Sequence, residues 1–161
     1  MFGFGKKKKT AGTAIVSPTA GKILPLSEVP DPAFSGGALG EGFAVDTAGD
    51  EICSPVSGDI IVLFPTGHAF AVRADSGVEV LVHIGVDTVS LKGDGFTKIK
   101  AQGDRVEAGE PVVRLDNREE TATKVPSLAT IVVVSNGQKF ATSELSMDAA
   151  AGETVMTATE K

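Results

Sequence analysis

Short stretches of alternating hydrophobic and polar positions recur along most of the chain, separated by turn residues. Nineteen glycines and eight prolines divide the 161 residues into segments rich in valine and isoleucine. Such alternation over about four to eight residues is typical of β-strands that bury one face. The clearest predicted strands are residues 58–64, 68–74, 78–86, 111–115 and 130–134. Helical periodicity is hard to find, although residues 118–123 could form a brief turn, so the pattern predicts an all-β fold.

Two segments, residues 16–24 and 53–61, resemble each other. Each contains Ser-Pro, a glycine three residues after the proline, and then an aliphatic pair. A proline that fixes φ and a glycine that tolerates positive φ favour a strand–turn–strand unit in both. A turn signal at residues 102–110 has a weaker echo at 151–155. We therefore predict a single-domain antiparallel β-sandwich or flattened barrel (a barrel-sandwich hybrid) with partial internal repetition.

A long loop-like tract, residues 27–41, separates the two Ser-Pro units. It contains two prolines and three glycines, which disfavour regular structure. Because loops of this length in compact domains are often binding elements, we expect this tract to contribute to a binding surface.

Length and charge limit the class of protein. A chain of 161 residues suits one domain, expected at residues 13–161 behind a flexible basic segment at residues 1–12. The formal net charge of −6 argues against nucleic acid as a partner, because phosphate contacts need a basic surface. The only basic cluster, residues 6–9, is either a solvated terminus or a weak, peripheral contact with an anionic membrane.

Neither a secretion signal nor a membrane span is evident. No apolar run approaches the roughly 20 residues of a transmembrane helix, so we expect a cytoplasmic protein. Cys53 is the single cysteine, which excludes an intramolecular disulfide and a cysteine-based metal cage. We interpret it as a small buried residue at a strand end rather than as a nucleophile.

The two histidines flank a predicted hairpin turn. A loop of even length centred on residues 75–76 would place His68 directly opposite His83, with Cβ atoms about 4.5–5.5 Å apart. A loop of three residues would shift the register and place His68 against Val82 or Ile84 instead.

Alternation along residues 78–86 indicates the direction of His83. Valine or isoleucine occupies every even position and predicts a core face, while His83 and Gly85 lie on the other face. There Gly85 would allow close approach of another molecule. The same face of the neighbouring strand is predicted to carry Thr66, His68, Phe70 and Val72, giving a mainly apolar patch that contains two imidazoles. Such a patch is typical of a partner site.

Several chemistries could use this pair of imidazoles. A zinc hydrolase would need a third ligand at least, and neither His-x-His nor His-Glu-x-x-His occurs. General acid–base catalysis on a small substrate suits histidine near neutral pH. In nucleophilic catalysis, one imidazole would attack phosphorus and the other would donate to the phosphoryl oxygens. Two structural histidines are a further reading, and spacing alone does not decide between the four.

Four segments resemble one known family. Residues 77–89, GVEVLVHIGVDTV, are similar to the phosphorylation-site signature of the glucose-type IIA component (type 1 EIIA) of the bacterial phosphoenolpyruvate-dependent sugar phosphotransferase system. Residues 66–70 resemble the segment of the family's second histidine, residues 29–34 its binding loop, and residues 91–96 the stretch after the active site. The resemblance extends from about residue 15 to residue 155.

The resemblance implies a phosphotransferase component that carries a phosphoryl group between proteins. His83 would accept phosphate through Nε2 from the histidine-containing phosphocarrier protein and pass it to a cysteine on the IIB domain of a membrane sugar permease. His68 matches the imidazole that orients the phosphoryl group, and Thr66 matches the hydroxyl that positions that imidazole. The implied docking surface includes Asp31, Phe34, Phe70, Gly85, Asp87 and Val89, with its two carboxylates suited to a basic residue of the donor.

No resident cofactor or metal is expected, although His68 and His83 could hold an adventitious zinc ion. The amphipathic start of better-known family members is longer than the one here, so membrane attachment does not follow from the resemblance. A biotinyl or lipoyl carrier domain is the rival from another class, because residues 103–110 resemble its glycine-bounded turns. Such domains place their lysine in Met-Lys-Met, which does not occur in this chain.

Overall fold

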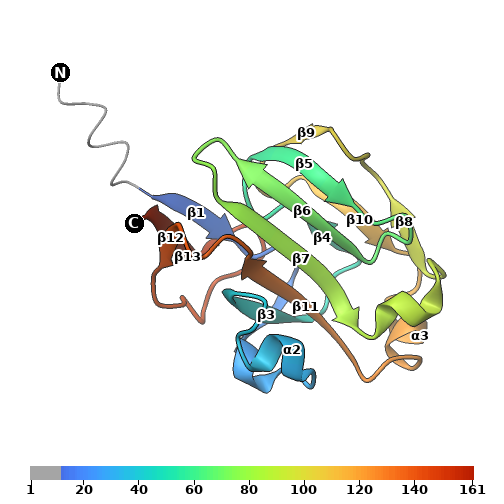
Figure 1. Ribbon diagram of the computed structural model, residues 1–161. Coiled ribbons are helices and arrows are strands. Elements are labelled where there is room, and N and C mark those ends of the chain that lie inside the picture. Colours follow the sequence, from blue (N-terminus) through green and yellow to red (C-terminus); the bar gives the residue numbers. More distant parts are fainter. Residues whose placement is uncertain (1–11) are drawn as a thin grey trace.

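A computed structural model describes residues 12–161, and nearly all of their regular structure is β-strand (Figure 1). The basic segment predicted at the start of the chain, with its membrane contact, lies outside the described residues apart from residue 12. The strands are β1 Thr13–Val16, β2 Gly21–Pro25, β3 Glu41–Thr47, β4 Glu51–Cys53, β5 Gly58–Leu63, β6 Ala69–Ala74, β7 Glu79–Val86, β8 Phe96–Lys98, β9 Arg105–Val106, β10 Pro111–Leu115, β11 Ser127–Val134, β12 Phe140–Thr142 and β13 Thr154–Glu160. The helical turns are η1 Leu26–Glu28, α2 Pro32–Ser35, η2 Thr88–Leu91 and α3 Arg118–Ala122. All five predicted strands are confirmed, as is the brief turn before β11.

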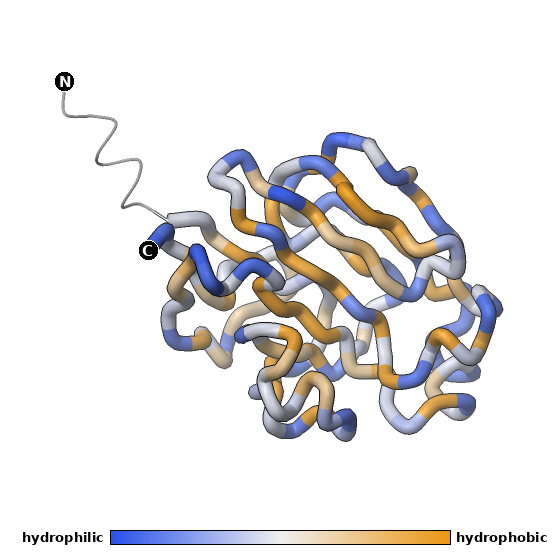
Figure 2. The backbone as a smooth tube through the Cα atoms, viewed as in Figure 1, coloured by the Kyte–Doolittle hydropathy of each residue, from blue (hydrophilic) through white to orange (hydrophobic). Residues whose placement is uncertain are grey.

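Three antiparallel sheets make up the fold. The largest has the strand order β2-β3-β11-β7-β6-β5-β9, and the two smaller ones have the orders β4-β10-β8 and β1-β13-β12. Side chains of all three sheets meet in one apolar cluster, to which β7 contributes the fully buried Val80, Val82 and Ile84. Figure 2 shows the hydrophobic positions following the central strands and the hydrophilic ones following the connecting loops. The predicted antiparallel β-sandwich is confirmed. The predicted core face of β7 is confirmed as far as Ile84, whereas Val86 belongs to a second apolar cluster on the other side of the large sheet.

The internal repetition is visible in matching hydrogen bonds. The buried Ser17 hydroxyl donates to the carbonyl two residues later at 2.9 Å, and the buried Ser54 hydroxyl does the same at 2.6 Å. The backbone pairs the two units reciprocally, through the bonds Val16 N to Pro55 O and Cys53 N to Pro18 O. The similar turns at residues 102–110 and 151–155 occupy equivalent positions, because Glu110 O accepts from Ser54 N and Glu153 O accepts from Ser17 N. The two Ser-Pro units are thus packed against each other.

The loop between the Ser-Pro units contains a short helix that sequence did not predict. The Asp31 carboxylate caps α2 by accepting from Ala33 N at 3.0 Å, and Pro32 at the first helical position lacks an amide that would need a partner. Phe34 from α2 is buried in a second apolar cluster with Ala44 and Ile131, on the outer face of β3 and β11. Figure 1 shows α2 beside β3 and β11, while no helix covers β5, β6 and β7 on that side.

The hairpin between β6 and β7 has a loop of three residues. Ala74 N donates to Val78 O at 2.9 Å, and Gly77 adopts φ +98° between them, as such loops require. Ala69 therefore pairs with His83 and Phe70 with Val82, so the even-length loop that would have paired the two histidines is wrong. The three-residue alternative is confirmed, because Ile84 N donates to His68 O at 2.7 Å.

This register overturns two predicted surface residues, Phe70 and Val72. Phe70 faces the same side as Val82, which is the core side, and is fully buried. Val72 is buried on that side for the same reason. Neither side chain can belong to an exposed docking surface, and the outer face of β6 carries Ala69 and Ala71 instead.

Candidate functional site

The two imidazoles lie side by side despite the shifted register. Their ring centroids are 5.1 Å apart and their planes are nearly perpendicular, at 80°. His83 projects from the outer face of β7, and His68 belongs to the turn just before β6. Strand alternation would have turned His68 toward the core side, but Gly67 at φ +77° breaks the extended backbone there. The proximity is as predicted, and its cause is the turn rather than cross-strand pairing.

A backbone carbonyl fixes the tautomer of His83. Nδ1 of His83 lies 2.8 Å from Gly85 O, and a carbonyl oxygen can only accept, so Nδ1 carries the proton and donates it. In the neutral ring, Nε2 then holds the free lone pair. Gly85 adopts φ +81°, in the left-handed region that favours glycine. We attribute the position of its carbonyl, within reach of the imidazole, to this backbone conformation.

The structure corrects the expected role of Gly85. Its backbone is buried, and an added Cβ would lie 2.5 Å from Thr88 Cγ2 and 3.3 Å from Ser127 O, both inside the protein. The absent side chain therefore makes room for the protein's own packing, not for an approaching partner. Gly85 contributes to the site through its carbonyl oxygen.

His68 is held by its neighbours in the turn. Its Nδ1 hydrogen-bonds to the Thr66 hydroxyl, which confirms the predicted proximity of the two groups. When that hydroxyl donates, Nε2 of His68 carries the proton and becomes a donor. The ring of Phe64 meets His68 edge to face with centroids 5.2 Å apart, and Phe34 packs against His83 at the same centroid distance. Only 3% of His68 is exposed, so its orientation is fixed by packing as well as by hydrogen bonding.

Burial lowers the pKa of both histidines. For His83, burial is opposed by the Gly85 carbonyl and by the negative charge of Asp31, which favour the protonated ring. For His68, burial and then the charge of a protonated His83 act in the same direction. Both imidazoles are consequently neutral near pH 7, the form in which Nε2 of His83 can act as a nucleophile.

The other predicted site residues surround His83 in different ways. Asp31 is half-buried at the start of α2 and Asp87 is exposed, so both carboxylates lie at the edge of the site. Val89, at the start of η2, is 55% exposed and can touch a partner directly. Phe34 is only 5% exposed, so it packs against the imidazole of His83 and offers little surface to a partner.

Sequence reasoning missed Phe64. This residue is 39% exposed beside His68, and Val62, two residues earlier on β5, is 38% exposed. The alternation along β5 could have revealed it. Val62 pairs with Ala71, and Ala71 pairs with Leu81 on the outer face of β7, so Val62 lies on the same face as His83. We call Val62, Phe64, Leu81 and Val89 the apolar rim.

Metal and thiol chemistry gain no support from the structure. Within residues 12–161, no group of three or more histidine, cysteine and acidic side chains could hold a metal ion. Cys53 lies on β4, outside the histidine site, and burial followed by the charge of Glu51 raises its pKa to about 11. Its thiol therefore stays neutral and unreactive. No helix of the described part of the chain is long and apolar enough to cross a membrane.

Comparison with known proteins identifies relatives over most of the chain. Residues 13–140 match the family described as phosphoenolpyruvate-dependent sugar phosphotransferase system, EIIA 1. The chain is 37% identical over 161 residues to the glucose-specific EIIA component of Halalkalibacterium halodurans, covering 96% of this chain and 92% of that protein. The solved structure of glucose permease IIA from Mycoplasma capricolum matches with a TM-score of 0.82 and 39% identity, over 89% of this chain and 93% of that one.

Other relatives are much longer than this chain. It is 47% identical over 137 residues to the mannose-specific EIIBCA component of Corynebacterium glutamicum, and 44% identical over 126 residues to a glucose-specific EIIBCA component from that species. These alignments cover 84% and 78% of this chain, but only 20% and 18% of the longer proteins.

Proposed function

Because this chain belongs to the EIIA 1 family of the phosphoenolpyruvate-dependent sugar phosphotransferase system, we propose that His83 is the residue that carries its phosphoryl group. Proteins of this family are phosphocarriers that transfer phosphoryl groups through a phosphohistidine, so the role of the chain in sugar transport follows from its membership. The assignment to His83 is supported above all by the hydrogen bond from its Nδ1 to Gly85 O, which leaves Nε2 as the nucleophilic nitrogen.

The proposed acceptance step needs no catalytic base. The lone pair of His83 Nε2 attacks the phosphorus atom of the donor's phosphohistidine, and the electron pair of the breaking N–P bond returns to the donor's imidazole. Since Nδ1 of His83 is already protonated and bonded to a carbonyl, the ring does not have to reorient before the attack. The Gly85 carbonyl then stabilises the positive charge that the ring gains as the new N–P bond forms.

His68 is proposed to hold the transferred group. Its Nε2–H, fixed by the Thr66 hydroxyl at Nδ1, is suited to donate to a phosphoryl oxygen on the neighbouring His83. Such a donor stabilises the charge on the phosphoryl oxygens while the group leaves, so it matters most in the transfer onward. The limited exposure of both rings also restricts water at the phosphohistidine, which slows its hydrolysis.

The proposed partners dock on the uncovered outer face around His83. The apolar rim supplies an exposed contact surface that loses its water when a partner docks. The carboxylates of Asp31 and Asp87 suit a basic group on the donor, which we propose to be the histidine-containing phosphocarrier protein. For the acceptor we propose a IIB domain of a sugar permease. Its pairing with this chain is supported by the longer relatives, whose names join EIIB, EIIC and EIIA in one component.

The assignment can be tested by phosphorylation with phosphoenolpyruvate and purified upstream carriers. We expect the His83→Ala variant to accept no phosphate by intact-mass measurement. His68→Ala should accept phosphate but pass it to the IIB domain about 10²-fold more slowly or worse. A spectrum of the phosphorylated protein by ¹⁵N-resolved NMR should place phosphorus on Nε2. Acceptance that survives in His83→Ala would overturn the assignment.

A matched control separates position from chemistry. The conservative variant His68→Gln keeps a side-chain donor near the phosphoryl group, so it should restore part of the onward rate lost in His68→Ala. Equal rates for the two variants would mean that a side-chain hydrogen-bond donor at position 68 does not support onward transfer.

A further inference from the structure

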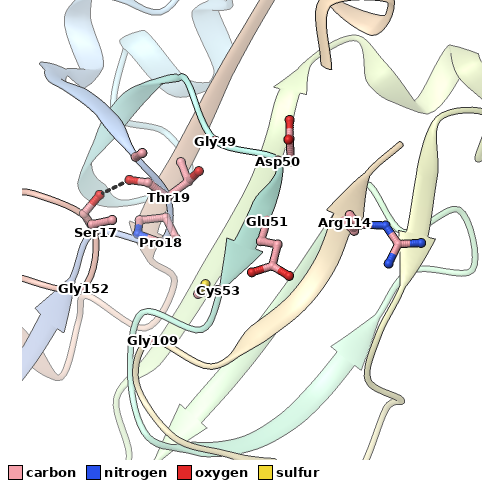
Figure 3. A pocket seen from close by; sticks show the side chains of 12 residues that line it. Ser17, Pro18, Thr19, Gly49, Asp50, Glu51, Cys53, Gly109, Arg114 and Gly152 are labelled. Carbon is pink, nitrogen blue, oxygen red and sulfur yellow. Dashed lines mark hydrogen bonds between the residues drawn. The ribbon is translucent and has the colours of Figure 1, made fainter. Parts of the chain in front are cut away.

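A cavity lies beside β4 and β10, and neither histidine lines it. It has a volume of about 620 Å³ and opens where the two Ser-Pro units meet (Figure 3). Ile52 and Val113 point inward from β4 and β10 and are fully buried, so Glu51 and Arg114 on the same strands point outward to the rim of this cavity. We propose that this cavity binds a small neutral polyol, of the size of a monosaccharide. The inference goes beyond the phosphocarrier role and does not depend on it.

The floor of the cavity offers hydrogen-bond donors without partners. Thr19 is 2% exposed, and its hydroxyl has no hydrogen-bond partner within the described residues. Figure 3 shows Thr19 on the cavity wall beside Gly49, where a Cβ added to Gly49 would lie 2.9 Å from Thr19 Oγ1. The amides of Thr19 and Ala20 also donate no hydrogen bond inside residues 12–161. A buried hydroxyl is normally satisfied, so this one lacks a bond that a ligand could supply. Because Gly49 covers the oxygen and leaves it almost no exposed surface, a ligand reaches it when the backbone at Gly49 shifts.

The rim of the cavity adds acceptors and one cation. Glu51 has no ion-pair partner among the described residues, and Asp50 has only a long contact of 3.7 Å with Arg118. Arg114 reaches Asp116 at 3.8 Å, so its guanidinium keeps free donors. The site therefore combines donors at the floor with both acceptors and donors at the rim.

This combination selects hydroxyl groups over charged ligands. A sugar hydroxyl can donate to a carboxylate while accepting from Thr19 or Arg114, so one ligand satisfies both sets. An anion would be repelled by the two carboxylates, and a cation would leave the donors at the floor unsatisfied. The volume falls in the range of about 300–1,000 Å³ that small-molecule sites occupy.

Two glycines in the cavity walls allow a ligand to approach the backbone closely. Gly109 and Gly152, at equivalent places of the two echoed turns, have open space where a Cβ would lie. Backbone rather than side chains thus forms two sides of the cavity, which lets a compact ligand reach the floor.

The test is an NMR titration of the full chain with D-glucose, followed through the backbone amides. We expect saturable shifts at Thr19, Ala20 and Gly49, with the amide of His83 unchanged. The Thr19→Val variant removes the hydroxyl at nearly constant volume and should weaken binding about tenfold. Gly49→Ala places a methyl group against Thr19 and should abolish the shifts. Thr121→Val is the matched control, because Thr121 is also a buried threonine but lies on α3, away from the cavity.

Three results would overturn the proposal. One is the absence of saturable shifts at the cavity amides, and another is equal binding by wild type and Thr19→Val. The third is tighter binding of glucose 6-phosphate than of glucose, which would make the site an anion site. Phosphate acceptance by His83 in both cavity variants, measured in the same preparations, verifies that they are folded.

Discussion

Replacement of Gly85 by alanine tests how the backbone of β7 prepares His83. The new methyl group would lie 2.5 Å from Thr88 Cγ2 and 3.2 Å from Leu128 Cδ1, both too close, and alanine at φ +81° is itself unfavourable. The backbone term amounts to about 1–2 kcal/mol, and the overpacking adds about 1–3 kcal/mol. We therefore expect the free energy of unfolding to fall by about 2–5 kcal/mol.

The same substitution should impair phosphate acceptance in the molecules that remain folded. Relief of the overlap requires the backbone at residue 85 to move, which lengthens the bond from His83 Nδ1 to the carbonyl. Loss of that bond removes a contribution that raises the pKa of His83 and frees the ring to adopt the other tautomer. We expect acceptance about tenfold slower, equivalent to the loss of one hydrogen bond of about 1.4 kcal/mol.

Urea unfolding and stopped-flow phosphorylation measure the two effects separately. The matched control is Gly37→Ala, because Gly37 has a similar φ of +79° but nothing within 4 Å of an added Cβ. It should lose only the backbone term of about 1–2 kcal/mol and keep the wild-type acceptance rate. If Gly85→Ala is no less stable than Gly37→Ala and accepts phosphate at the same rate, the role assigned to Gly85 is refuted.

Two more predictions concern pH and the apolar rim. Both histidines have a pKa below 6.5 in the folded protein, so the unfolded chain binds more protons as the pH falls through 6.5. The free energy of unfolding should therefore decrease from pH 7 toward about pH 5.5, and unfolding curves of a variant with both histidines changed to glutamine should lack this slope. Phe64→Ala removes the exposed ring that packs on His68, and we expect phosphate transfer to both partners to slow several-fold. Met147→Ala, at a position of similar exposure in the loop before β13, should leave the transfer rate unchanged, and equal rates for the two variants would exclude Phe64 from the docking surface.

Sequence alone determined the properties that depend on local patterning. The alternation of residues 78–86 identified both the buried face of β7 and the outward direction of His83, because side chains of a strand point to opposite faces by geometry. The repeated Ser-Pro and glycine spacing predicted the internal repetition, since these residues restrict the backbone wherever they occur. The predicted strand at residues 111–115 coincides with β10, because a short valine-rich segment that follows a turn favours a strand.

Only the tertiary structure decided how these elements meet. The loop after β6 has three residues instead of two, and this one-residue difference moved Phe70 from the predicted surface into the core. Gly85 resembled an open position in the sequence, but Thr88 and Ser127 pack against it from η2 and β11. The closeness of His68 and His83 arises from the turn at Gly67, which no periodicity describes. Register, packing around a glycine and the path of a turn depend on residues distant in sequence, and the chemistry of this site depends on all three.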